Sequence, residues 1–101
     1  MTTQPVEVDI PHTLGKAAAR ARVEGGFGQI ADMIPGGHVT EHHWEGDSLT
    51  FTIEALGQRI ASRLDIFDAR VHATVNLPPF LALFAEAIRA KLAKEGTVLL
   101  K

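Results

Sequence analysis

Apolar and polar residues alternate with a period of two along much of the chain, which is the pattern of strands that bury one face. The clearest run spans residues 48–55, where Leu49, Phe51 and Ile53 alternate with polar side chains. Strand-like segments occupy residues 6–10, 38–45, 48–55, 60–66 and 70–77. Only short turns separate the last four, one of them expected at Gly57-Gln58, so these segments predict a meander of four antiparallel strands.

The segment after the first strand has a helical pattern instead. Its first half, AAARARVE, is rich in residues with high helix propensity, and Thr13 precedes it as a candidate N-cap. We expect one helix over residues 14–33, with an apolar stripe formed by Leu14, Ala17, Ala21, Phe27, Ile30, Ala31 and Ile34. Glycines weaken a helix interior, so this helix is expected to kink or break near Gly25.

A second helical segment, PPFLALFAEAIRAKLAKEG, completes the order of elements. Its prolines suit the first turn of a helix, and Gly96 is expected to end it. The order is therefore β-α-β-β-β-β-α, which predicts an α+β fold in which an antiparallel sheet carries both helices packed on one face. At 101 residues the chain fits a single domain, with its core over about residues 6–95.

Composition and charge limit the classes of partner. The chain is 46% hydrophobic and 22% charged, which is ordinary for a soluble globular protein. Its formal net charge is -2 and its basic residues are scattered, so it lacks the basic patch that binds nucleic acid. The N-terminal stretch has no secretory pattern, and no apolar run approaches the ~20 residues of a transmembrane helix. We therefore expect a cytoplasmic protein that neither binds nucleic acid nor crosses a membrane.

The candidate chemical residues do not form a recognisable constellation. A zinc site needs three or four converging ligands, and the five histidines lack such a spacing. Adjacent His42 and His43 leave opposite faces of a strand, whereas His38 and His42 share a face but lie ~13 Å apart along it. An enzymatic function would need His12, His42 or His72 beside a carboxylate in a cleft. We expect a non-enzymatic protein with no catalytic residues, no metal and no cofactor.

Apolar residues in the C-terminal helix exceed what one buried stripe requires. They are explained either by a curved sheet that grips the helix deeply or by a dimer seam, a lipidic ligand or an apolar contact surface. Trp44, next to a predicted turn, is expected to pack in the wall of a hairpin, with the lining of a ligand cavity as the alternative. The candidates for a hydrophobic surface or ligand site are Trp44, Phe51, Phe80, Phe84 and Ile88.

Several short motifs in this order resemble the polyhydroxyalkanoic acid system proteins, also called granule-region proteins. They are HTLG at residues 12–15, AAARARVE, WEGDSLTF at 44–51 and LPPFLALFAEAIRAKL at 77–92. The resemblance covers about residues 6–92 and departs from the family's pattern at GGFG and between Ile34 and Trp44. The order of elements also resembles TATA-binding-protein repeats and helix-grip lipid-binding proteins, although a shared fold does not establish function.

The resemblance implies a role in the bacterial polyhydroxyalkanoate, or storage polyester, system. We expect an accessory protein that binds the granule, a polymer-metabolism enzyme or a second copy of itself through its apolar helix surface. The alternative is a small helix-grip carrier that holds an acyl or hydroxyacyl ligand between Trp44, Phe51, Phe84 and Ile88. A homodimer is favoured, because a sheet covered on one face leaves a broad surface for self-association.

Overall fold

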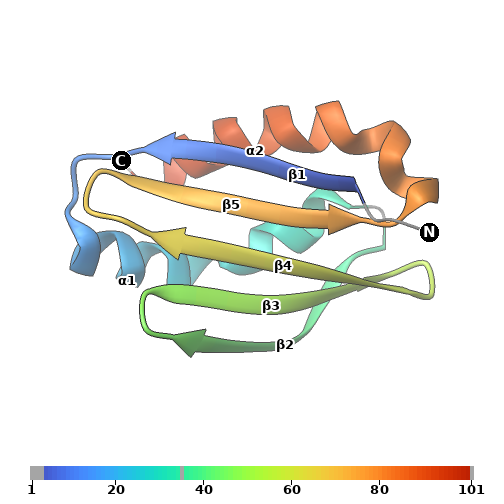
Figure 1. The fold of residues 1–101 in the computed structure, drawn as a ribbon, viewed down its shortest axis with the longest axis horizontal. Coiled ribbons are helices and arrows are strands. Elements are labelled where there is room, and N and C mark those ends of the chain that lie inside the picture. Colours follow the sequence, from blue (N-terminus) through green and yellow to red (C-terminus); the bar gives the residue numbers. More distant parts are fainter. Residues whose placement is uncertain (1–3, 35, 101) are drawn as a thin grey trace.

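The computed structural model describes residues 4–34 and 36–100, apart from the side chains of Gln4, Met33 and Phe80. The described chain forms one five-stranded antiparallel sheet with two helical segments on one face (Figure 1). The predicted α+β class and meander are confirmed. The strands are β1 (Gln4–Pro11), β2 (His38–Glu45), β3 (Ser48–Ala55), β4 (Gln58–Ile66) and β5 (Arg70–Leu77). In space their order is β1-β5-β4-β3-β2, so β1 and β2 form the two edges.

The first helical segment differs from the predicted single helix. It consists of an α-helix, α1 (Lys16–Gly26), and a 3-10 helix, η1 (Phe27–Met33). The change follows the glycine-rich stretch, which lowers the preference for a continuous α-helix. The prediction of Thr13 as the N-cap is wrong: Gly15, with a φ of 81°, occupies that position, and no side chain caps the helix.

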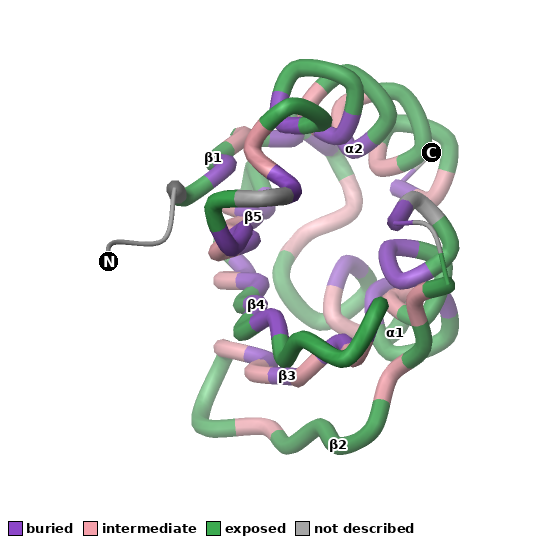
Figure 2. Tube along the Cα trace, turned by 90° about the vertical axis from the view of Figure 1, so that its right-hand side faces the viewer, coloured by how far each residue is buried: buried purple, intermediate pink, exposed green. Residues whose placement is uncertain are grey.

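The predicted apolar stripe is confirmed in its second half, where Ile30, Ala31 and Ile34 are buried, but is wrong within α1. Ala19 and Val23 are buried at 0% and 2% exposure, whereas Ala17 and Ala21 are exposed. The helix turns Val23 toward the sheet because a branched side chain buries more apolar surface there than alanine does. Figure 2 shows the buried stretches of both helical segments facing the sheet.

The second helical segment begins as a 3-10 helix, η2 (Pro79–Phe84), and continues as α2 (Ala85–Leu99). The expectation that Gly96 ends this helix is wrong, because α2 runs on for three more residues. Gly96 instead allows a close approach to the edge strand. A Cβ atom at this position would lie 2.3 Å from Cδ1 of Ile10.

The strands bury the faces that their alternation predicts. In β3 the pattern runs strictly between half-buried and buried residues, with Leu49, Phe51 and Ile53 inside. The turn between β3 and β4 consists of Leu56 and Gly57 instead of Gly57 and Gln58, and both have positive φ, 51° and 76°. Two left-handed residues form a type I′ turn, one of the two turn types that suit a two-residue hairpin because their twist matches that of the flanking strands.

An irregularity in β2 changes the faces of its histidines. The pairing with β3 shifts register between Val39 and Glu41, which marks a bulge. His42 therefore lies opposite the buried Phe51, on the inner face, whereas His38 and His43 lie opposite Glu54 and Thr50 on the outer face. The expectation that His38 and His42 share a face is wrong, because a bulge inserts one residue and reverses the alternation.

Candidate functional site

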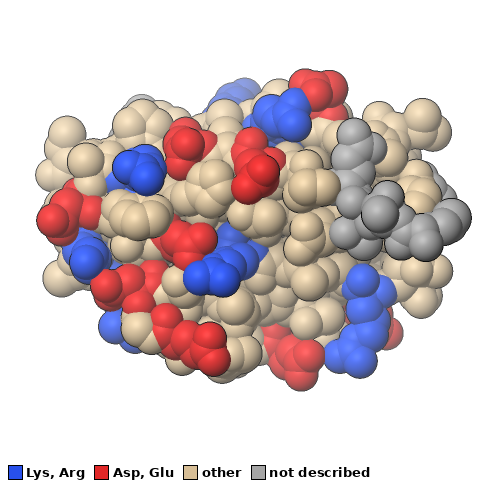
Figure 3. Space-filling view, in the orientation of Figure 1, with Lys and Arg blue, Asp and Glu red and all other residues tan. Residues whose placement is uncertain are grey.

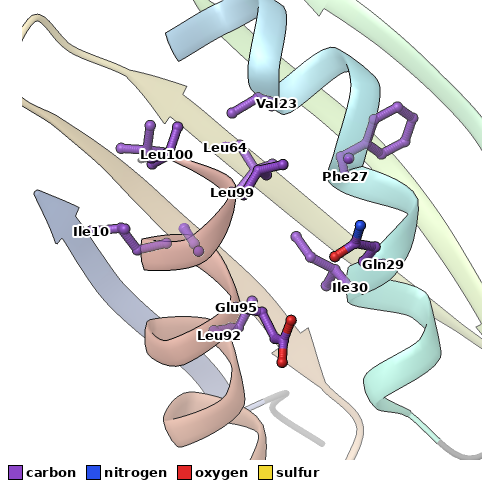
Figure 4. Close-up of a pocket in the computed structure, with 14 residues that line it drawn as sticks. Ile10, Val23, Phe27, Gln29, Ile30, Leu64, Leu92, Glu95, Leu99 and Leu100 are labelled. Carbon is purple, nitrogen blue, oxygen red and sulfur yellow. The ribbon is translucent and has the colours of Figure 1, made fainter. Parts of the chain in front are cut away.

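The helical layer leaves a narrow apolar groove between its two halves. One wall comes from α1 and η1, the other from the last turns of α2, and the floor from β4 and β5 (Figure 4). Only Gln29 and Glu95 carry polar ends among the labelled side chains. The residues that line the groove are Ile10, Val23, Gly26, Phe27, Gln29, Ile30, Leu64, Val71, Ala73, Leu92, Glu95, Gly96, Leu99 and Leu100.

The chain's own side chains fill most of this groove. The cavity that remains is about 30 Å³, close to the volume that one water molecule occupies in the liquid. Leu99 packs so closely against α1 that a Cβ added to Gly26 would lie 2.5 Å from its Cδ1. Binding sites for small molecules usually measure about 300–1,000 Å³. A bound acyl chain would therefore require the two walls to separate.

Trp44 lies outside this groove, at the edge of the sheet. It pairs with Leu49 across the hairpin, is half-buried and packs against the core. The guanidinium of Arg20 lies over its ring, 4.3 Å from the centroid, in a cation–π contact. Its Nε1 is buried and has no hydrogen-bond partner among the described residues. Trp44 therefore packs in the wall of the hairpin, the first of the two surroundings predicted for it.

The other predicted candidates fall into two groups. Phe51 and Ile88 are core residues with exposures of 3% and 2%. Phe84 ends η2 and is 41% exposed. The side chain of Phe80 lies outside the described residues. The structure does not bring Trp44, Phe51, Phe84 and Ile88 together around one cavity, because the groove is lined by other residues. Their joint role as ligand contacts stays a prediction.

Among the described residues, five large apolar side chains are exposed; Phe67 and Val98 lie apart from the other three, which share one end of the sheet. Strands β3 and β5 run in the same direction, so the residues that follow them lie at the same end (Figure 1). Leu56 follows β3 and is 63% exposed, whereas Leu83 and Phe84 follow β5 and are 92% and 41% exposed. We call these three residues the apolar end. An almost fully exposed leucine beside a phenylalanine exceeds what packing requires.

His12 has a structural role that its sequence context did not reveal. It is 8% exposed, and its Nδ1 lies 3.2 Å from the backbone nitrogen of Leu14. Because that backbone group only donates, Nδ1 accepts, and the proton on Nε2 is donated to the carbonyl oxygen of Phe67 at 3.0 Å. A neutral imidazole therefore ties the β1–α1 corner to the β4–β5 loop.

The outer face of the sheet is polar, and charges of both signs are interspersed over it (Figure 3). His72 lies between two carboxylates of β1: its Nδ1 is 2.8 Å from Asp9 and its Nε2 is 3.2 Å from Glu7. The hydrogen bond to Asp9 raises the pKa of His72, burial opposes the rise, and the bond to Glu7 adds to it. This histidine lies beside carboxylates, but on an open sheet face.

A shallow hollow of about 370 Å³ also lies on this face, over β3 and β4. Its charged residues are already matched, because Arg63 pairs with Asp65 and Glu41 pairs with Arg59. Burial alone would raise the pKa of Asp65, but hydrogen bonds from Ser48 and Arg63 outweigh it and lower the pKa. The pairing of these charges leaves little to attract an ionic ligand.

The described part of the chain offers neither a metal-binding cluster nor a membrane-spanning helix. Within residues 4–34 and 36–100, no three His, Asp or Glu side chains come together in a way that could hold a metal ion. None of the helices in these ranges has the length and apolar character needed to span a membrane. The candidate sites that the described residues offer are thus the apolar end and the groove.

The fold and these sites define a small α+β protein whose helical layer presents apolar side chains at one end. The comparison with protein families narrows this class. The family model described as "Putative polyhydroxyalkanoic acid system protein" matches residues 6–100. The chain therefore belongs to that family, as its motifs predicted. No curated protein and no solved structure matches it.

Sequence reasoning missed part of the apolar end. Leu83 belongs to the surplus apolar residues of the C-terminal helix but is not among the predicted site candidates, and Leu56 follows a predicted strand directly. One signal could have found Leu56: a two-residue turn closed by Gly57 places the preceding residue in the left-handed region, where leucine is unusual. The signal for Leu83 is its spacing from Leu81: residues two apart on a helix point to opposite sides, and Leu81 is fully buried.

Proposed function

We propose that this protein is a non-enzymatic accessory protein of the polyhydroxyalkanoate system, and that its apolar end binds the hydrophobic surface of the storage polyester granule. The family supplies the process. The observation that carries the binding role is the exposure of Leu83 and Phe84, 92% and 41%, at the start of the C-terminal helical segment.

The physical basis of this proposal is burial of apolar surface. A polyester granule offers an apolar phase, and transfer of a leucine or phenylalanine side chain from water into such a phase contributes about 1.5–3 kcal/mol. Leu83 makes most of its surface available at no cost to the core, because its neighbour Leu81 fills the core position. η2 is short and follows directly from β5, so the sheet holds the two side chains in place.

A granule-binding assay with purified components tests this proposal. Leu83→Ser combined with Phe84→Ser is expected to weaken sedimentation with isolated granules by roughly 30-fold or more, the equivalent of about 2 kcal/mol. Val98→Ser is the matched control, because Val98 is also on the C-terminal helix and is 58% exposed. Equal binding by wild type, the double variant and the control would contradict the proposal. If the protein bound a polymer-metabolism enzyme and not the granule, the partner of the apolar end would be a protein.

The groove supports a second candidate function, a carrier of an acyl or hydroxyacyl ligand. Its lining is almost wholly aliphatic, and Gln29 and Glu95 place an amide and a carboxylate at its rim (Figure 4). The side chain of Leu99 occupies the space that an acyl chain would enter. Leu99→Ala is therefore expected to increase binding of a 3-hydroxydecanoate probe in calorimetry. Absence of saturable binding by both wild type and variant would eliminate the carrier.

A further inference from the structure

The two edges of the sheet differ in their protection against other strands. An edge strand exposes unpaired N–H and C=O groups, and proteins usually blunt such edges with proline, lysine or a bulge. β1 carries Pro5 and Pro11, which have no N–H to donate. β2, the opposite edge, has neither proline nor lysine, and six of its eight residues are exposed (Figure 2). Its blunting devices are the bulge near its beginning and the charges of Glu41 and Glu45.

The regular part of β2 presents hydrogen-bonding groups to solvent at defined positions. After the bulge, residues 41–45 pair with β3 without interruption up to the two-residue turn at Gly46 and Asp47. In such a hairpin the pair that flanks the turn, Glu45 and Ser48, exchanges hydrogen bonds, and the bonding then alternates along the strand. The N–H and C=O groups of His42 and Trp44 therefore point away from β3, toward the free edge.

When two such edges pair antiparallel, three registers place the free N–H and C=O groups of His42 or Trp44 opposite those of the second copy. The two-fold axis then passes through residue 42, 43 or 44. An axis at His43 places Glu41 opposite Glu45 of the second copy, two like charges, and an axis at His42 brings the bulge into the pairing. An axis at Trp44 keeps the bulge and the Glu41–Glu45 pair out of the interface and places each Glu45 opposite His43 of the second copy. Glu41 then lies level with Asp47 of the second copy, but Asp47 belongs to the turn and is paired with Lys16 at 3.1 Å.

We propose that β2 pairs antiparallel with β2 of a second copy, with Trp44 on the two-fold axis, and so joins two sheets into one. Opposite residues of antiparallel strands point to the same face. The axis is therefore perpendicular to the sheet, and both helical layers lie on the same side of the dimer. This interface leaves the apolar end of each copy uncovered, because its residues follow the ends of β3 and β5, whereas Trp44 pairs with Leu49 near the start of β3.

Cysteine cross-linking tests this interface with little background, because the chain contains no cysteine. Paired strands place opposite Cα atoms about 4.5–5.5 Å apart, within the range that a disulfide bridges. Trp44→Cys is expected to form a disulfide-linked dimer at least tenfold faster than Val98→Cys, an exposed position on α2 that serves as the collision control. Faster cross-linking by His42→Cys or His43→Cys would overturn the register.

Charge variants keep the proposal testable if Trp44→Cys does not fold. Wild type is expected to show a concentration-dependent dimer in sedimentation equilibrium. Glu45→Lys places lysine opposite His43 of the second copy and is expected to weaken the dimer about fivefold or more, since two symmetric pairs are lost. His43→Glu combined with Glu45→Lys restores opposite charges and the dimer. A wild type that stays monomeric at 0.5 mM, or a Glu45→Lys variant that dimerises as wild type does, would overturn the proposal.

Discussion

Gly96 provides a quantitative test of how α2 packs on the sheet. In a helix interior, alanine is more favourable than glycine by about 1 kcal/mol. At Gly96, however, the added Cβ would lie 2.3 Å from Cδ1 of Ile10 and 3.1 Å from its Cγ1. Ile10 is only 4% exposed and has little room to move, and overpacking of this kind costs about 1–3 kcal/mol. Gly96→Ala is therefore expected to lower the free energy of unfolding by about 1 kcal/mol.

Gly25 is the matched control for this substitution. It lies within α1, is exposed, and has no atom within 4 Å of the position that an added methyl group would occupy. Gly25→Ala should therefore gain the helix propensity alone and raise the free energy of unfolding by about 0.5–1 kcal/mol. Urea denaturation followed by circular dichroism measures both variants. The two substitutions are expected to differ by about 2 kcal/mol, or roughly 10 °C in Tm.

A second substitution separates a steric clash from a helix end. Ile10→Val removes Cδ1, the nearest atom, at a cost of about 0.5–1.5 kcal/mol on its own. Combined with Gly96→Ala it should cost less than the sum of the two single changes, by about 1 kcal/mol or more. If Gly96→Ala stabilised the protein as Gly25→Ala does, or if the two effects were simply additive, the close packing of α2 on Ile10 would be refuted.

Three individual contacts lead to further predictions. In the wild type, the raised pKa of His72 contributes stability that is complete below the ordinary histidine pKa of about 6.5 and is lost as the pH rises through the raised pKa. His72→Gln should remove this contribution, which unfolding measured from pH 5 to 9 would show. An unchanged pH profile would contradict this prediction. His12→Ala should lower the free energy of unfolding by about 2 kcal/mol by leaving the Leu14 N–H and the Phe67 carbonyl unpaired, and a loss below about 0.5 kcal/mol in urea denaturation would argue against this role. Leu56→Asn should raise the Tm, because asparagine tolerates a φ of 51° better than leucine, and a lower Tm in a thermal melt would count against the assigned turn.

The sheet could be predicted from sequence because its signals are local. Leu49, Phe51 and Ile53 alternate with polar residues, and the register of a hairpin follows from such a pattern and a short turn. The bulge in β2 left no comparable signal, because HVTEHHWE alternates poorly in any register. The faces of His38 and His42 could therefore not be assigned correctly from the sequence.

The helices show the limit of local signals more clearly. Gly25 and Gly96 carry the same intrinsic helix penalty, yet α1 ends one residue after Gly25, whereas α2 continues for three residues after Gly96. The difference comes from Ile10, which is distant in sequence and needs a residue without a side chain opposite it. His12 is similar, since its role depends on the Phe67 carbonyl, 55 residues away. Tertiary contacts of this kind override propensity.

The apolar end was predicted in part. Surplus apolar residues in LPPFLALFAEAI indicated an exposed surface, and helical spacing places Leu83 on the opposite side from Leu81, which agrees with their exposures of 92% and 0%. The same spacing also places Phe84 with Leu81 in the buried stripe, and this part is wrong, because Phe84 is 41% exposed.

The measurement that tests the central claim most directly is localisation of the fluorescently tagged protein in a polyester-accumulating bacterium. Wild type and Val98→Ser are expected to coat the granules, whereas Leu83→Ser combined with Phe84→Ser stays dispersed while its circular dichroism spectrum remains that of the wild type. If the double variant coated the granules as wild type does, or if wild type never reached them, the proposal that the apolar end binds the granule surface would be contradicted.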